Sequence, residues 1–267
     1  MRRLLAGIAG LVAAVALAAT VLSGWVDRTI VQTEGFVDLT TELSGSETIR
    51  EQVRDLVVEG LVDDAGLDSQ LAGTIGDLLA RAAEAALGDD AYAAAWEQTI
   101  RLSHEATLSG QAPDGEFRLE LAPIAAQVAE RSGGLVPPPE SVPLDVEGGP
   151  SRDRLADVHE IADAAQPSAL VAAVAAVLAL LVARRRAAAL AWLGLGAIAA
   201  AALVVAVAAG LPTWSTDTVE PAFAPLARTI AEAAADSLRD EAVVPALGGA
   251  IALVVGAVGA LLTRRSA

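Results

Sequence analysis

The sequence contains no cysteine and no lysine, and aromatic residues make up only 3% of its 267 residues. Without cysteine, no disulfide, thiolate nucleophile or thiolate metal site can form. Without lysine, all 18 basic residues are arginines. Alanine, leucine, valine and glycine supply most of the 54% hydrophobic content, and such residues favour closely packed helices over a β-rich core. The composition therefore predicts an all-α fold.

The charges are distributed unevenly along the chain, whose net charge is −16. Segment 25–166 holds 28 acidic and 9 basic residues, and segment 211–242 holds 6 acidic and 2 basic residues. The other seven basic residues are accompanied by no acidic residue: Arg2, Arg3, Arg184, Arg185, Arg186, Arg264 and Arg265. The acidity disfavours nucleic acid as a partner, because binding to phosphate needs a basic surface.

Four uncharged apolar runs lie between these charged segments, and each is long enough to cross a bilayer as a helix. The first run has an alternative interpretation as a signal peptide, since Ala16-Leu17-Ala18 resembles a cleavage site. The apolar part of a signal peptide usually has about 7–15 residues. This run is longer, so we expect an uncleaved anchor. Either interpretation places residue 25 and those after it outside the cytoplasm.

The seven arginines without acidic neighbours predict the sidedness of the chain, because cytoplasmic loops are enriched in Lys and Arg. The composition is typical of a high-GC bacterial genome, so we expect a multi-pass protein of the bacterial plasma membrane with both termini in the cytoplasm. The predicted segments are a cytoplasmic N-terminus 1–3, span 4–24, an extracytoplasmic domain 25–166, span 167–183, a cytoplasmic arginine loop 184–186, span 187–210, an acidic extracytoplasmic segment 211–242, span 243–262 and a cytoplasmic C-terminus 263–267.

The extracytoplasmic domain shows helical periodicity over most of its length. We expect helices that begin at Ser46, at residue 68 and at Asp89 or Asp90, and a later one that begins at Ser151. The second helix is expected over 68–87, with its apolar residues on one face: Leu71, Ile75, Leu78, Leu79 and Ala82. Pro113-Asp114-Gly115 indicates a turn, and the stretches 117–121 and 141–146 are expected to form one short β pairing. Segment 218–240 is expected to be an amphipathic helix with Phe223, Leu226, Ile230 and Leu238 as its apolar residues.

The third of these helices carries the candidate site. Tyr92, Trp96, Ile100 and His104 recur every four residues and would share one face. The face is either a ligand site with His104 as its polar group or the ordinary core of the domain, and the core is the more frequent explanation. His159 is the only other histidine, so no metal site is expected, and neither is a catalytic residue or a cofactor.

The same helix carries a resemblance to uncharacterised actinobacterial membrane proteins with four spans. Their pattern Phe-x3-Trp-x7-His followed by Leu-x-Gly is matched by Tyr92, Trp96 and His104 and by Leu108-Ser109-Gly110. The Leu-Ala-Pro that ends their next alternating stretch is matched by 121–123. Tyr92 departs from the usual phenylalanine, and the proline that usually precedes the first helix of the domain is missing around 43–46. The resemblance implies an α-helical extracytoplasmic domain and no activity.

The spans and the domain together predict a role. No span carries an ionisable residue in its middle, which disfavours an ion-coupled transporter. We expect a non-enzymatic scaffold or accessory protein of the cell envelope, with the lipid bilayer and a membrane or envelope protein as its partners. The alternative is a sensor for a small extracytoplasmic ligand that signals through a membrane partner.

Overall fold

The computed structural model describes residues 2–65, 69–88, 91–215 and 224–265, and the chain divides into two compact units. The membrane unit comprises 1–31, 156–215 and 231–267, and the helical unit comprises 32–155 and 216–230. The expected all-α fold is confirmed, because the described residues form helices and one two-stranded sheet.

The membrane unit contains the predicted spans. Its long helices are α1 (Arg2–Trp25), α8 (Ala165–Val182), α9 (Arg186–Ser215) and α11 (Val243–Arg265). Among the described residues, four helical stretches are long and apolar enough to cross a membrane: Leu4–Val31, Arg152–Val182, Arg186–Thr213 and Ala224–Thr263. They expose large aliphatic side chains such as Leu170 and Val244, as surfaces that face lipid do. The chain is therefore a multi-pass membrane protein.

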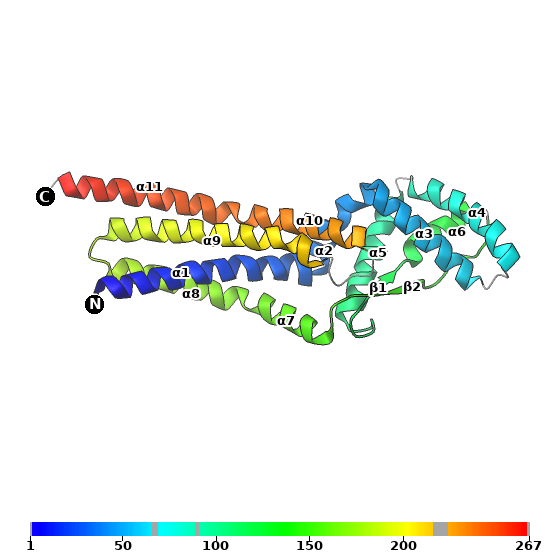
Figure 1. Ribbon diagram of the computed structural model, residues 1–267, viewed down its shortest axis with the longest axis horizontal. Helices are drawn as coiled ribbons and strands as arrows, with labels where there is room; N and C mark the ends of the chain where they lie inside the picture. Colours follow the sequence, from blue (N-terminus) through cyan, green and yellow to red (C-terminus); the bar gives the residue numbers. More distant parts are fainter. Residues whose placement is uncertain (1, 66–68, 89–90, 216–223, 266–267) are drawn as a thin grey trace. The chain divides into compact units, whose positions relative to one another are not determined.

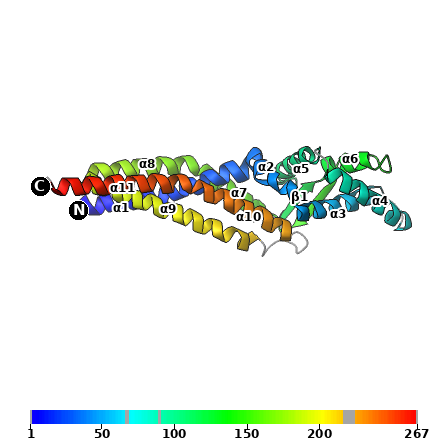
Figure 2. The ribbon, with the colours of Figure 1, turned by 90° about the horizontal axis from the view of Figure 1, so that it is seen from above.

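The four long helices run side by side, with α9 between α11 and α1, and with α8 against α1 (Figures 1 and 2). Glycines allow α9 and α11 to approach closely. A Cβ added at Gly194 would lie 2.4 Å from the Gly249 carbonyl oxygen, and one at Gly256 would lie 2.4 Å from the Ala191 nitrogen. The small residues of α11 thus pack within the chain against α9.

Three parts of the membrane unit lie at the same end of it: the start of α1, the connection between α8 and α9, and the end of α11 (Figure 1). The connection comprises residues 183–185, and Arg186 already begins α9, so the predicted loop 184–186 is displaced by one residue. Arg184, Arg185 and Arg186 are all exposed.

The helical unit is built mainly from short amphipathic helices. Its helices and strands, in chain order, are α2 (Thr33–Thr41), a 3₁₀ turn (Glu42–Gly45), α3 (Glu47–Asp64), α4 (Ser69–Leu87), α5 (Ala91–Leu108), β1 (Glu116–Glu120), α6 (Ala122–Arg131) and β2 (Pro143–Glu147). A π-helical turn (Val26–Val31) precedes it in the chain, while α7 (Arg152–Asp163) and α10 (Ala224–Glu241) begin in it and end in the membrane unit.

The predicted helix starts are confirmed to within one residue where the structure describes them. Ser46 and Ser151 both precede a helix, and only Ser151 caps it with its side chain, accepting a bond from the Arg154 amide at 3.4 Å. The predicted buried face of α4 is wrong at Leu78, which is 40% exposed, whereas Leu79 is fully buried. The expected caps at Asp89 or Asp90 and the expected apolar residue Phe223 lie outside the described residues.

The predicted β pairing is present with ends displaced by one or two residues. β1 and β2 are antiparallel, with Phe117 opposite Val146 and Leu119 opposite Leu144. The turn before β1 is closed by a hydrogen bond from the Glu116 amide to the Pro113 carbonyl at 3.1 Å. Gly115 supplies the positive φ of 84° that this turn requires.

Candidate binding site in the helical unit

Helix α5 is the central element of the site, because it contacts α2, α6 and β1. Its end is closed by two hydrogen bonds, from the Gly110 amide to Thr107 O and from the Gln111 amide to Ala106 O. Gly110 has a φ of 74°, so this is a Schellman ending that depends on glycine. The helix therefore stops where the Leu-x-Gly pattern predicts.

The predicted face of α5 lies in the interior of the helical unit. Tyr92, Trp96, Ile100 and His104 are each at most 6% exposed. The Trp96 indole nitrogen donates to the Thr40 carbonyl oxygen at 3.0 Å. The His104 ring stacks on Phe36 with centroids 4.7 Å apart, and its Nδ1 lies 3.2 Å from the Thr33 hydroxyl. His104 thus has the partners of a core histidine.

Tyr92 occupies the position where the resembled pattern has phenylalanine. Its ring lies tilted against Trp96, with centroids 6.2 Å apart. Its hydroxyl is buried and has no hydrogen-bond partner. Burial raises the pKa of this phenol to about 12, although the charge of Arg50 acts in the opposite direction. Tyr92 therefore packs as a phenylalanine would.

A second row of polar residues on α5 was not predicted. Thr99, Ser103 and Thr107 recur every four residues and are each at most 5% exposed. The Ser103 hydroxyl donates to Thr99 O at 2.7 Å and accepts from the Glu120 amide at 2.9 Å. The Thr107 hydroxyl donates to Ser103 O at 2.8 Å and accepts from the Arg118 amide at 3.3 Å. These two hydroxyls therefore satisfy the amides of β1 that point away from β2.

The opposite side of β1 is fixed by an ion pair across the sheet. Arg118 lies directly opposite Asp145, and its Nε and Nη2 each donate to one carboxylate oxygen at 2.7 Å. The bond from the Arg118 guanidinium lowers the pKa of Asp145, and the same bond raises the pKa of Arg118. β1 is thus held between α5 and β2.

A cavity of about 260 Å³ lies beside α5 within the helical unit. Its walls come from α2, α3, α5, β1 and the first part of α10. They are mostly apolar and include Phe36, Ile49, Trp96, Phe117 and Leu226. Of the four predicted face residues, Trp96 and Ile100 line the cavity, whereas Tyr92 and His104 do not.

Thr99 is one of the polar residues in the wall of this cavity, together with Gln52, Asp55 and Glu59. It lines the cavity and is 2% exposed. Its hydroxyl has no hydrogen-bond partner, although the hydroxyls of Ser103 and Thr107, one and two turns further along α5, each have two. A buried hydroxyl without a partner costs about 1–3 kcal/mol. The wall of the cavity therefore includes a residue whose hydroxyl is buried and unsatisfied.

Acidic residues form part of the cavity wall on α3. Asp55 and Glu59 are one helical turn apart and both are exposed. Asp55 forms an ion pair with Arg54 at 2.9 Å. None of the described residues that line the cavity is basic. The charge of Asp55 in the cavity wall is thus balanced by the neighbouring Arg54.

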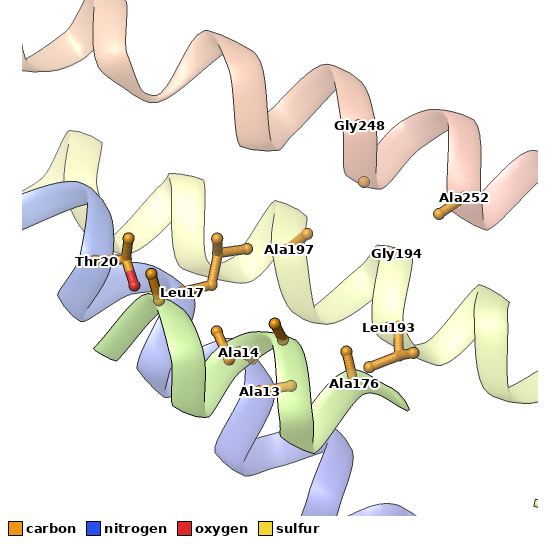
Figure 3. Close-up of a pocket in the computed structure, with 14 residues that line it drawn as sticks. Ala13, Ala14, Leu17, Thr20, Ala176, Leu193, Gly194, Ala197, Gly248 and Ala252 are labelled. Carbon is orange, nitrogen blue, oxygen red and sulfur yellow. The ribbon is translucent and has the colours of Figure 1, made fainter. Parts of the chain in front are cut away.

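The membrane unit contains a groove of a different kind, about 400 Å³ in volume, among α1, α8, α9 and α11 (Figure 3). Figure 3 shows that small side chains such as Ala13, Ala176 and Ala197 line it. The hydroxyl of its polar residue Thr20 already donates to Ala16 O at 2.8 Å and lies 3.1 Å from the Ser168 hydroxyl. The groove therefore offers space without an unused polar group.

The sequence pattern predicted the buried face of α5, but it did not predict the row of polar residues on the same helix. Thr99, Ser103 and Thr107 are visible in the sequence as a four-residue repeat, but their strand partners lie beyond a turn. Among the described residues, no group of three or more His, Asp or Glu side chains is arranged to hold a metal ion. Comparison of the chain with known protein families, with curated proteins and with solved structures finds no match.

Proposed function

We propose that this chain is a bacterial cell-envelope protein whose helical unit lies outside the cytoplasm and acts as a non-enzymatic scaffold or accessory subunit. One observation carries the sidedness: the start of α1, the α8–α9 connection and the end of α11 lie at the same end of the membrane unit (Figure 1). In the sequence these three places carry the seven arginines that have no acidic neighbours. Clustered arginines favour the cytoplasmic side.

The interaction role is supported by the form and charge of the helical unit. The unit has its own buried core, which includes Ile49, Leu79 and Ile124. Its surface carries many carboxylates, among them the exposed Glu59, Glu84 and Glu105. An acidic body tethered by four spans is suited to contact another envelope or membrane protein, with the bilayer as its second partner. The resemblance to actinobacterial four-span proteins agrees with this proposal and stays a prediction.

Photo-crosslinking in the living cell tests the interaction role. A benzophenone amino acid is placed at Glu59, Glu84 or Glu105 of the helical unit, and at the exposed Leu170 of α8 as a matched control. A scaffold predicts one discrete protein adduct that recurs from at least one of the first three positions and is absent at Leu170. If none of the three positions gives a discrete adduct at native expression, the interaction role is wrong.

The cavity favours a second candidate function, which is a sensor for a small ligand. The wall of the cavity combines aromatic residues such as Trp96 and Phe117 with polar residues such as Gln52. Leu226 and Ile230, which also line it, belong to α10, and that helix is followed in the chain by the span α11. A ligand that contacts these residues would contact a segment connected to the membrane unit through the backbone.

A further inference from the structure

We infer that the cavity beside α5 and the acidic edge of α3 form one docking surface for a positively charged segment of a partner protein, which inserts an apolar side chain into the cavity. This inference rests on the proposed scaffold role and names the class of partner that the helical unit contacts. It combines two observations: the accessible apolar side chains around the cavity, and the row of carboxylates that passes along its edge.

The cavity is apolar and partly open. Some of its lining side chains, such as Ile49 and Trp96, are buried, and the polar Gln52 of its wall is neutral. Five apolar lining residues are only half-buried and keep part of their surface accessible: Phe36, Leu56, Phe117, Leu226 and Ile230. The cavity measures about 260 Å³. An apolar cavity of roughly 150 Å³ in another protein accepts benzene, so one phenylalanine or leucine side chain of a partner fits here.

Carboxylates recur at every fourth position along α3. All five members of this carboxylate row are exposed: Glu47, Glu51, Asp55, Glu59 and Asp63. Two of them, Asp55 and Glu59, belong to the wall of the cavity, so the row passes along its edge. Like charges four residues apart on a helix repel one another. Positive charges of a partner placed along the row would relieve this repulsion.

The arginines of α3 neutralise only part of the carboxylate row. Arg54 is paired with Asp55 at 2.9 Å, and Arg50 donates to a backbone carbonyl of the preceding turn at 3.0 Å. Glu51 and Glu59 form no ion pair with any residue that the structure describes. The edge of the cavity therefore retains negative charge after Asp55 is set aside.

The two features together select the partner. Exposed ion pairs contribute little by themselves and are screened by salt, so the charges need an apolar contact beside them. A segment with Lys or Arg on both sides of a Phe or Leu supplies both, because its apolar side chain leaves water while its charges face the carboxylate row. An acidic segment with the same apolar side chain is repelled.

The test uses the full-length protein in phosphatidylcholine nanodiscs, with 5-fluorotryptophan in place of all 4 tryptophans. The ¹⁹F signal of Trp96, which is assigned with Trp96→Phe, reports on the cavity that this residue lines. The probe is a short arginine peptide with one central phenylalanine. Two matched peptides replace the phenylalanine with alanine, or every arginine with glutamate.

Two protein variants separate the carboxylate row from the general acidity of the helical unit. The first carries Glu51→Gln and Glu59→Gln, and it is expected to fold because both side chains are exposed. The control carries Glu84→Gln and Glu105→Gln, which remove the same charge from exposed positions that do not line the cavity.

We expect the arginine peptide to shift the Trp96 signal saturably and the glutamate peptide to leave it unchanged. The alanine peptide should bind at least about tenfold more weakly, because it has no ring to bury. Loss of Glu51 and Glu59 should raise the half-saturating concentration about three- to tenfold, and the control variant should raise it less than about twofold.

The inference is overturned if the Trp96 signal does not move, if the alanine or glutamate peptide binds as tightly as the probe, or if the two protein variants bind alike. These results are distinct from a failure of the scaffold role. A discrete crosslink from Glu84 or Glu105, with no effect of the peptide on Trp96, would refute this docking surface and leave the scaffold role standing. Absence of a crosslink from all three positions would refute the scaffold role itself.

Discussion

Three hydroxyl-bearing residues of one helix have different roles. Ser103 and Thr107 both donate to the carbonyl four residues before them and accept from an amide of β1. Thr99 does neither and lines a cavity instead. The same chemical group therefore connects α5 to a strand at two positions and is buried without a partner at the third.

The strand contact leads to a prediction for Ser103→Ala. The substitution leaves the Glu120 amide without its partner at 2.9 Å, which costs about 1–2 kcal/mol where the site is partly buried. Hydrogen exchange of residues 116–120, measured by mass spectrometry on the full-length protein, should become about 5–30-fold faster. Ser109→Ala is the control, because that exposed hydroxyl bonds only within its own turn to Ala106 O. Equal exchange in both variants would contradict the role given to Ser103.

Local sequence patterns predict which side chains of α5 are buried, but they do not predict the partners of these side chains. The four-residue spacing correctly placed Trp96 and His104 on a buried face, because helical periodicity is local. The ring of His104 stacks on Phe36 and lies within hydrogen-bonding distance of Thr33, and both residues are about 70 positions earlier in the chain. The cavity requires α3, α5, β1 and α10 together, so no local pattern could have indicated it.

At the scale of helices, the pairing of α9 with α11 depends on glycine at defined positions. A Cβ at Gly256 would lie 2.4 Å from the Ala191 nitrogen and 2.6 Å from the Ala187 oxygen. These are backbone atoms, so the two helices would have to separate. Gly248 lies on the same helix and has no atom within 4 Å of an added Cβ.

Alanine at these two glycines should therefore have opposite effects. Gly256→Ala introduces overpacking of about 1–3 kcal/mol, and we expect a lower apparent Tm of the protein in mild detergent. Gly248→Ala adds helix propensity of up to about 1 kcal/mol without a clash, so its Tm should be unchanged or higher. The close approach of α9 and α11 would be refuted by a Gly256→Ala protein as stable as the Gly248→Ala protein.

The positions of the helices and strands were largely predictable from the sequence, whereas the faces that they expose were less predictable. Apolar runs, serines before helices and glycines after them are local signals, and they placed most of the described helices within a few residues. Leu78 was expected in the core because it shares a periodic face with Leu79, yet α4 presents a narrower apolar stripe. The β pairing could be foreseen from two short alternating stretches, whereas its bond to α5 could not.

At the scale of the whole molecule, we propose that the helical unit lies outside the cytoplasm. We propose this sidedness from the charge pattern of the sequence, and it requires the three arginine-bearing segments to lie at one end of the membrane unit, as they do. The proposal places the acidic helical unit outside the cytoplasm and the arginines inside.

Cysteine accessibility in intact cells tests this claim most directly, because the chain has no cysteine of its own and each introduced thiol is unique. Gln111→Cys reports on the helical unit, and Arg185→Cys reports on the α8–α9 connection while Arg184 and Arg186 remain; both positions are exposed. With a membrane-impermeant maleimide, we expect Gln111→Cys to be labelled in intact cells and Arg185→Cys to be labelled only after permeabilisation. Labelling of Arg185→Cys in intact cells, with Gln111→Cys protected until permeabilisation, would contradict this proposal.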